Sequence, residues 1–102
     1  MNISIDYDST YTRDPQLWNL FIRSAHTRGH VVYCVTARSA EYEGEVEQVL
    51  DTIGQLIGSD HCIFTGGLAK RPYCEANNIN IHVWIDDMPE AIPAGMKHLF
   101  GE

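Results

Sequence analysis

Four short segments of the chain carry hydrophobic residues in patterns that predict β-strands. Residues 2–7 alternate polar and apolar side chains, and residues 81–85 carry isoleucine or valine at every second position. Residues 31–36 form an unbroken run of strand length, and residues 61–65 form a shorter apolar run. Alternation and β-branched residues are typical of strands, and an unbroken run is typical of a parallel strand buried on both faces. We therefore expect four strands.

Between these strands, hydrophobic residues recur at the three- and four-residue spacing of an amphipathic helix. Asp14 and Pro15 are typical of an N-cap and a first helical position, and Gly29 is a stop signal. A second helix is expected from the spacing of apolar residues over 46–57, with acidic first turns over 41–47 that complement the helix dipole. Gly54 is expected to weaken this helix and Gly58 to end it. Pro72 can begin a short third helix. Strands and helices therefore alternate along the chain.

This alternation, with short loops, predicts an α/β protein with a parallel sheet covered on both faces. The expected architecture is three-layered, α/β/α, and Rossmann-like. The chain has 102 residues, which is below the roughly 150 residues of an average domain. We therefore expect residues 1–102 to form a single domain with one core.

Composition and charge exclude several classes of protein. Hydrophobic residues make up 44% of the chain, which excludes disorder, and a formal net charge of −7 argues against general nucleic-acid binding. No apolar run approaches the roughly 18 residues that span a bilayer, and we expect neither a leader nor a membrane partner. An odd number of cysteines cannot all pair, so we expect free thiols and a cytoplasmic protein. The three cysteines are Cys34, Cys62 and Cys74.

Polar residues occur where the predicted strands end. In a parallel α/β sheet, ligands bind beside the carboxyl ends of the strands, so side chains at those ends converge on one edge. Lys70 is expected in the loop after the third strand, and the other residues directly at the strand ends. The residues concerned are Asp6, Asp8, Thr36, Lys70, Asp86 and Asp87. Their convergence, rather than any one of them, points to a binding site.

The carboxylates in this set predict a metal site. Asp6 and Asp8 are two residues apart, so along an extended strand their side chains point the same way. Two unit charges about 4 Å apart repel by about 4 kcal/mol at an effective dielectric constant of 20, so we expect a cation to hold the group together. Oxygen ligands without Cys or His favour a hard ion. We predict Mg²⁺, held by Asp6, Asp8, Asp86 and Asp87.

The same residues suit the chemistry of a phosphoryl group. Lys70 adds positive charge, and Thr36 offers a hydroxyl donor for an anionic oxygen. A carboxylate next to a phosphorus atom can attack it and form an aspartyl-phosphate, and we assign this role to Asp6. A second carboxyl can protonate the leaving alcohol and then deprotonate water, and we assign this role to Asp8. The sequence therefore predicts a phosphatase.

These positions also resemble the four motifs of the haloacid dehalogenase-like (HAD) phosphohydrolases. In this sequence the motifs read Asp6-Tyr7-Asp8-Ser9-Thr10, Thr36, Lys70 and Asp86-Asp87, in the family's order. The resemblance implies that Asp6 is the nucleophile and a metal ligand. It implies that Asp8 is the general acid and base and gives its backbone carbonyl to the metal.

The resemblance also implies roles for the remaining positions. Thr36 would hydrogen-bond the phosphoryl oxygens, and Lys70 would stabilise the nucleophile and the transferred group. Asp86, with Asp87 beside it, would complete the Mg²⁺ site. Thr10 would help to hold the loop after the first strand.

No interval between the motifs is long enough for an inserted cap domain, so the resemblance implies the minimal, capless type with an open site. It links open sites to large substrates or to a partner that closes the site. We expect a phosphorylated substrate, either a small molecule or the end of a macromolecule. Arg38 is expected to reach a substrate phosphate, because Thr-Ala-Arg-Ser resembles a stretch of nucleotide and polynucleotide phosphatases; a surface arginine that caps a loop is the alternative. Ser9 stands where phosphatases of the family usually have glycine, and a left-handed backbone costs more for serine.

Two other interpretations fit part of this pattern. A phosphorelay receiver domain also places aspartates, a threonine and a lysine on a parallel sheet. Its phosphorylated aspartate follows the third strand, where this chain has Thr65 and Gly66. The other alternative is a binding module that keeps the fold and the metal site but has lost turnover; the intact Asp8 and Lys70 argue against it.

Overall fold

The computed structural model describes residues 1–93 and contains a four-stranded sheet. Its strands are β1 (Asn2–Ile5), β2 (Val31–Thr36), β3 (Cys62–Phe64) and β4 (Val83–Ile85). They lie in the order β3-β2-β1-β4, and every pair is parallel. In the register of the central strand, Ser4 lies opposite Tyr33 on one side and Trp84 on the other. The predicted parallel α/β class is confirmed.

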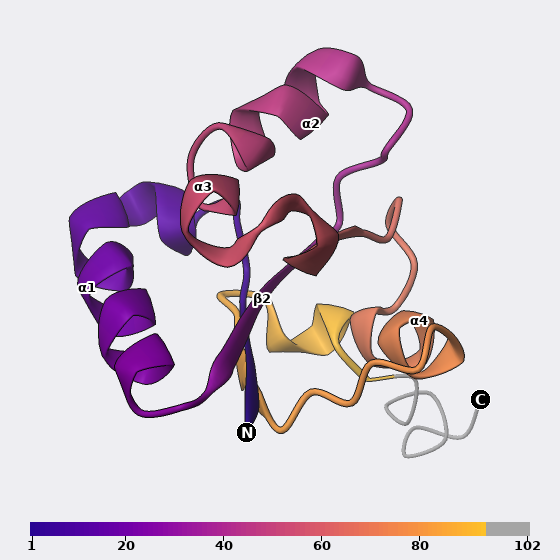
Figure 1. The fold of residues 1–102 in the computed structure, drawn as a ribbon. Helices are drawn as coiled ribbons and strands as arrows, with labels where there is room; N and C mark the ends of the chain where they lie inside the picture. Colours follow the sequence, from indigo (N-terminus) through magenta and orange to yellow (C-terminus); the bar gives the residue numbers. More distant parts are fainter. Residues whose placement is uncertain (94–102) are drawn as a thin grey trace.

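Helices lie on both faces of this sheet. The helices are α1 (Pro15–Thr27), α2 (Glu43–Leu50), α3 (Gly54–Ile57) and α4 (Lys70–Ala76). Three short 3-10 turns are η1 (Tyr11–Arg13), η2 (Ser59–His61) and η3 (Pro89–Ala91). Figure 1 shows α1 and α3 on one side of the sheet, α4 on the other, and α2 beyond the ends of the strands. None of the helices in residues 1–93 combines the length and the apolar character needed to cross a bilayer.

The two faces of β2 explain why its sequence is an unbroken apolar run. Val32 and Cys34 belong to the core on the α1 and α3 side, whereas Tyr33 and Val35 pack on the α4 side. Successive side chains of a strand point to opposite faces, so a strand covered on both faces needs apolar residues at every position. Full burial of a valine side chain stabilises the folded protein by about 1.5–3 kcal/mol relative to leaving the side chain exposed.

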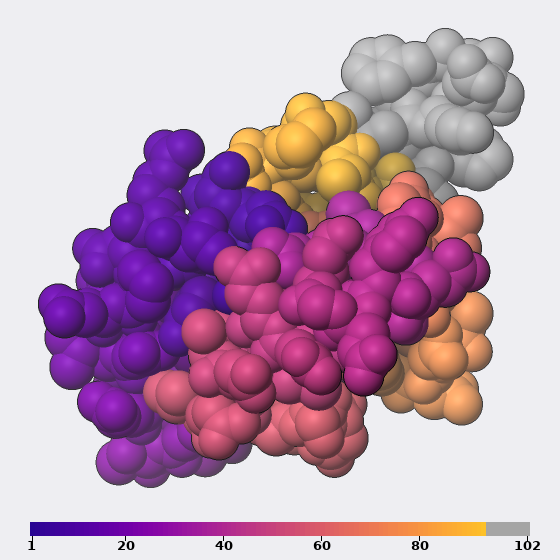
Figure 2. Space-filling model, turned by 90° about the horizontal axis from the view of Figure 1, so that it is seen from above, coloured from indigo at the N-terminus to yellow at the C-terminus, as the bar shows by residue number. Residues whose placement is uncertain are grey.

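The strand order creates the crevice at which the site lies. From β1 the chain runs outward through β2 to β3, and it then returns to place β4 on the other side of β1. The neighbouring strands β1 and β4 therefore flank the point where the order reverses, which is where ligands bind in open α/β sheets. Figure 2 shows the indigo residues that follow β1 beside the yellow residues that follow β4.

The predicted second helix is wrong as a single element, because residues 51–53 separate α2 from α3. The Thr52 hydroxyl donates to the carbonyl of Gln48 at 2.7 Å, which satisfies a free acceptor in the last turn of α2. Gly54 then begins α3 in close contact with the preceding turn and with β3. A Cβ built at Gly54 would lie 3.3 Å from the Val49 carbonyl oxygen and 3.5 Å from Cys62 Sγ.

Several predicted boundaries also shift. The strand expected over 2–7 ends at Ile5, because residues 7–10 form a turn. Helix α4 begins at Lys70 rather than at Pro72, which sits in its first turn where no backbone donor is needed. After β4, Pro89 begins the 3-10 turn η3.

The prediction of free thiols is confirmed for all three cysteines, each of which is buried and unpaired. Cys34 and Cys62 lie opposite each other on β2 and β3, in the core beneath α3. Cys74 lies on α4, on the other face of the sheet. Burial raises the pKa of each of these thiols, so they behave as small apolar side chains.

The tight packing of Gly54 reverses the effect expected from helix propensity. Alanine normally stabilises a helix interior by about 1 kcal/mol relative to glycine. We expect Gly54→Ala to lower the free energy of unfolding by about 1–2 kcal/mol, because the added methyl group crowds a backbone oxygen. Gly44→Ala in α2 is the control, because a Cβ there meets no atom within 4 Å, and it should stabilise. Urea unfolding of both variants measures the difference, and stabilisation by Gly54→Ala would contradict this packing.

Candidate functional site

Asp6 is the first residue after β1, and the turn that follows it is anchored in the core. The Asp6 backbone N–H donates to the Ile85 carbonyl at 2.9 Å, so Asp6 continues the pairing of β1 with β4. Tyr7 is buried beneath the turn, and its hydroxyl lies 2.9 Å from Thr52 Oγ1. Ser9 takes the left-handed conformation, with φ 64°, although it is not glycine. This turn ends the extended backbone and sends the side chains of Asp6 and Asp8 in different directions.

Lys70 joins three elements through one buried ammonium group. Its Nζ donates to Asp6 Oδ1 at 2.8 Å and to Asp86 Oδ2 at 2.5 Å, and only 3% of the lysine side chain is exposed. Lys70 is the first residue of α4, so it reaches the site from the face of the sheet opposite α1. A buried charge is tolerated only when it is paired and hydrogen-bonded, and two carboxylates meet this requirement.

Thr10 links the acidic residues that follow β1 and β4. Its Oγ1 lies 3.3 Å from Asp6 Oδ2 and 3.2 Å from Asp87 Oδ1, and it accepts a hydrogen bond from the Asp87 backbone N–H. The carbonyl of Thr10 accepts from the indole N–H of Trp18 on α1 at 2.9 Å. These hydrogen bonds connect the turn after β1 with the residue after β4 and with α1.

Asp6, Asp86 and Asp87 form a group that can ligate a cation. Each can offer a carboxylate oxygen such that the three oxygens lie within 4.8 Å of one another, and residues 1–93 contain no other such group of acidic, histidine or cysteine side chains. The donors are all oxygen, which fits a hard cation rather than zinc. The Asp8 side chain lies outside this group. Three of the four aspartates that were expected to hold the metal therefore come together.

Burial and the neighbouring charges perturb the pKa of several of these groups. Desolvation raises the pKa of Asp6 to about 6, although Lys70 opposes the shift. Burial lowers the pKa of Lys70, but its hydrogen bonds to Asp6 and Asp86 raise it by more, so the net shift is upward. The pKa of Asp87 is lowered, chiefly by its hydrogen bond with the Asp6 carboxyl and then by that with Thr10. At neutral pH, Asp6 is therefore an ionised carboxylate in a poorly solvated place.

Asp8 lies against Arg38 instead of the acidic group. The arginine donates from Nε to Asp8 Oδ2 at 2.9 Å and from Nη2 to Oδ1 at 2.8 Å, a two-point ion pair. These bonds hold the pKa of Asp8 below its usual range. Arg38 also stacks over the ring of Tyr7 and donates to the carbonyl of Glu45. Arg38 therefore contacts a site residue and also ties the loop after β2 to α2, while its expected contact with a substrate phosphate stays a prediction.

The predicted residues come together around one cavity of about 160 Å³. Thr36 is buried there at the end of β2, and its hydroxyl accepts from the Arg38 backbone N–H at 3.2 Å. The residues that line the cavity are Asp6, Asp8, Ser9, Thr36, Ala37, Lys70, Asp86, Asp87, Met88 and Ala91. All six polar residues expected at the strand ends are among them. Thr10 and Arg38 do not line the cavity and act on it through their neighbours.

The site has further contributors that the sequence pattern does not indicate. Met88 and Ala91 of the η3 segment form part of the cavity wall. Gln48 on α2 accepts from Arg38 Nη1 at 3.0 Å, and thereby fixes the guanidinium that holds Asp8. None of these carries a motif, and the only sequence signal near Met88 and Ala91 is the Asp86-Asp87 pair that directly precedes Met88.

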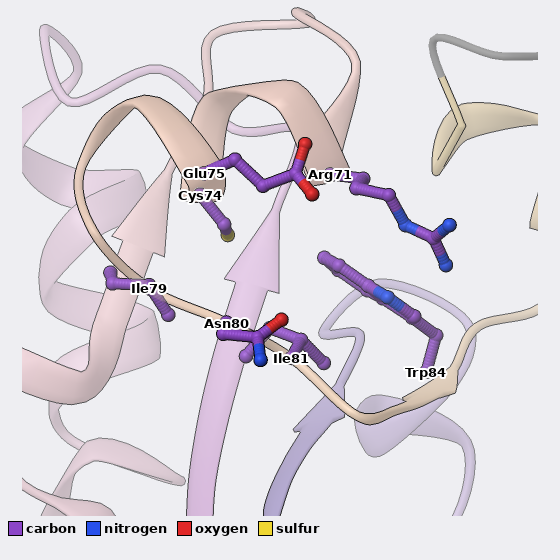
Figure 3. A pocket seen from close by; sticks show the side chains of 7 residues that line it. All are labelled: Arg71, Cys74, Glu75, Ile79, Asn80, Ile81 and Trp84. Atoms are coloured by element: carbon purple, nitrogen blue, oxygen red, sulfur yellow. The ribbon is translucent and has the colours of Figure 1, made fainter.

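A second hollow lies away from the acidic group, on the α4 side of the sheet. Figure 3 shows the seven residues around it, with the Trp84 ring below the Arg71 side chain. Its volume is about 210 Å³, and its lining residues are Arg71, Cys74, Glu75, Ile79, Asn80, Ile81 and Trp84. The indole N–H of Trp84 is buried there without a hydrogen-bond partner among the described residues.

Comparisons with protein-family models, with curated proteins and with solved structures find no match to this chain. The chemistry of the site therefore rests on its own residues and their geometry.

The raised pKa of Asp6 makes stability depend on pH in a defined direction. Because the folded-state pKa of about 6 exceeds the ordinary 3.8, the folded state binds a proton more tightly than the unfolded state does. The free-energy cost of ionising the buried Asp6 carboxyl in the folded protein is absent below about pH 4 and complete above pH 6. In metal-free buffer at pH 7, the free energy of unfolding of Asp6→Asn should therefore exceed that of wild type by about 3 kcal/mol, since Lys70 keeps Asp86 as a charged partner.

Urea unfolding of wild type and Asp6→Asn at pH 4 and pH 7 measures this effect, with EDTA present. The advantage of the variant should disappear at the lower pH. Glu47→Gln, at an exposed position on α2, is the control and should show no such dependence. An advantage of the same size at both pH values would contradict the assigned burial penalty.

Proposed function

We propose that this protein is a Mg²⁺-dependent phosphohydrolase of the haloacid dehalogenase-like type, which cleaves a phosphomonoester through an aspartyl-phosphate. One observation carries the proposal. Carboxylates and a threonine hydroxyl from the ends of β1, β2 and β4, together with a lysine from the start of α4, line one small cavity at the point where the strand order reverses. A buried cation beside a carboxylate nucleophile and a hydroxyl donor is suited to an anionic group that gains charge as it reacts.

Asp6 is the nucleophile in this proposal. Its buried carboxylate is poorly solvated, and Lys70 and Thr10 hold it at fixed positions. One of its oxygens forms a bond to phosphorus while the bond from phosphorus to the ester oxygen breaks. Lys70 and Thr36, both buried, face the phosphoryl oxygens and offset their charge.

Asp8 moves the protons in both halves of the reaction. It gives a proton to the departing alkoxide in the first half. In the second half, water attacks the phosphorus of the aspartyl-phosphate, the bond from phosphorus to the Asp6 oxygen breaks, and Asp8 takes a proton from the water. The sum is ester plus water giving alcohol plus inorganic phosphate.

Asp6, Asp86 and Asp87 would hold the Mg²⁺ ion. Three carboxylate oxygens within 4.8 Å of one another suit the oxygen donors that this ion prefers. When bound, Mg²⁺ supplies positive charge for the phosphoryl oxygens. Without it, Lys70 is the cation that this chain itself places against two of the three carboxylates.

The metal site is tested by thermal unfolding. Mg²⁺ that binds only the folded protein should raise the melting temperature with concentration, by an amount that corresponds to about 2.7 kcal/mol at one hundred times the dissociation constant. Asp87→Asn, which removes one charge at an exposed position, should weaken the dependence. NaCl at equal ionic strength is the control. A melting temperature that does not change up to tens of millimolar Mg²⁺ would refute the site.

The two aspartates are distinguished by their kinetics. Asp6→Asn should abolish release of phosphate from aryl and alkyl phosphates, because the amide is a poor nucleophile. Asp8→Asn should slow an alkyl phosphate by about 10²–10⁴-fold and an aryl phosphate less, because a phenolate leaves without acid assistance. Rapid quench of Asp8→Asn with the aryl substrate should show a burst of phenol followed by slow phosphate release. Equal slowing of both substrates by Asp8→Asn, with no phosphoenzyme trapped, would refute these roles. If the wild-type protein releases no phosphate from either substrate, the binding module without turnover is the interpretation that stands.

A further inference from the structure

The ion pair between Arg38 and Asp8 has two unequal partners. Arg38 Nη1 donates to the Glu45 carbonyl at 2.9 Å and to Gln48 Oε1 at 3.0 Å, both on α2, and its guanidinium carbon lies 4.9 Å from the centre of the Tyr7 ring. The Arg38 side chain is 12% exposed, whereas that of Asp8 is 56% exposed. The guanidinium is therefore the fixed partner, and the carboxylate is the partner that can leave.

The pair also occupies the groups that Asp8 needs for the reaction proposed above. Both carboxylate oxygens of Asp8 accept hydrogen bonds from Arg38. The pair uses one lone pair on each carboxylate oxygen and holds the carboxylate against Arg38. When Asp8 turns instead to an alcohol or a water in the cavity, the two-point pair opens and leaves two aligned N–H donors without an acceptor.

Those two donors define the group that can replace Asp8. The Nε and Nη2 edge of a guanidinium matches the two oxygens of a carboxylate or of a phosphate, and it is bonded most favourably by an anion. A substrate that carries such a group beside its phosphomonoester restores the bonds that Asp8 gives up. A substrate with a neutral group in that place leaves the donors unpaired.

Resting on the proposed phosphohydrolase function, we propose that Arg38 is the specificity-determining residue of this site. It holds Asp8 until a second anionic group of the substrate takes the place of that carboxylate. The preferred substrates are therefore phosphomonoesters with a second anionic group, a carboxylate or a further phosphate, close to the phosphate that is hydrolysed. Arg38 thus positions Asp8 in the free protein and binds the second anion in the complex.

Matched substrates that differ in one group test this proposal. 3-Phosphoglycerate and glycerol 3-phosphate share a primary phosphate and differ in a carboxylate, and adenosine 3′,5′-bisphosphate and adenosine 3′-phosphate differ in a second phosphate. Wild type should show a kcat/KM at least tenfold higher for the doubly anionic member of a pair. Free phosphate release with Mg²⁺ is the measurement.

Arg38→Met then separates this role from a structural one, because it keeps an unbranched apolar stem over Tyr7 and removes every donor. It should lower kcat/KM for the substrates with a second anionic group by tenfold or more, and should raise that for the substrates without one, since Asp8 is then free of the guanidinium. Arg38→Lys, with charge but without the paired donors, should fall between. Arg23→Met, at an exposed position on α1, should match wild type.

The outcomes distinguish this proposal from the function on which it rests. Turnover by wild type without preference for a second anion, or an equal fall for both members of each pair in Arg38→Met and Arg38→Lys, would refute the role of Arg38 and leave the phosphohydrolase standing. No turnover of these substrates or of an aryl phosphate by wild type would refute both. If Arg38→Met does not fold, the Arg38→Lys ratio decides the question alone.

Discussion

One buried ammonium group both belongs to the site and holds elements of the fold together. Lys70 comes from α4 on one face of the sheet, and its Nζ bonds the carboxylates of Asp6 after β1 and Asp86 after β4. Removing the ammonium group would leave both carboxylates without compensation, and breaking a buried ion pair in this way typically costs about 3–5 kcal/mol. The pair therefore ties α4, β1 and β4 to a single arrangement. That arrangement also places Asp87 and Thr10 beside Asp6.

Two aspartates only two residues apart have opposite electrostatic environments. Burial raises the pKa of Asp6 to about 6, whereas Arg38 lowers that of Asp8. The turn over residues 7–10 causes the difference, since it directs Asp6 towards β4 and Asp8 towards α2. Two carboxylates whose environments separate their pKa values are suited to two different chemical roles. The proposed reaction needs the opposite order, with Asp6 ionised and Asp8 protonated, and a cation bound at Asp6 and the release of Asp8 from Arg38 would each favour that order.

Arg38 extends the site from the sheet to α2. Its guanidinium spans Asp8 on one side and Gln48 on the other, and the Tyr7 ring lies beneath it. Tyr7 in turn bonds Thr52 in the segment between α2 and α3. The break in the helix, the turn after β1 and the position of Asp8 are therefore physically linked.

The parallel sheet and the residues at its edge followed from the sequence alone. An unbroken apolar run such as residues 31–36 can be satisfied only by burial on both faces, and alternating strands and helices leave a parallel sheet as the arrangement. Because the carboxyl ends of parallel strands lie on one edge, Asp6, Thr36, Lys70 and Asp86 could be expected to meet there. All four line the same cavity.

Only the tertiary structure decided which of these groups touch. Strand periodicity predicted that Asp6 and Asp8 point the same way, but Tyr7 is buried against Thr52 and the chain turns at that point. Helical spacing predicted one helix over residues 46–57, but Gly54 packs against Cys62 and the helix divides. In both cases a contact between residues more than seven positions apart in the chain overrides the local pattern. Sequence periodicity reports which residues are buried, whereas the partners of a buried group depend on long-range packing, which no local pattern encodes.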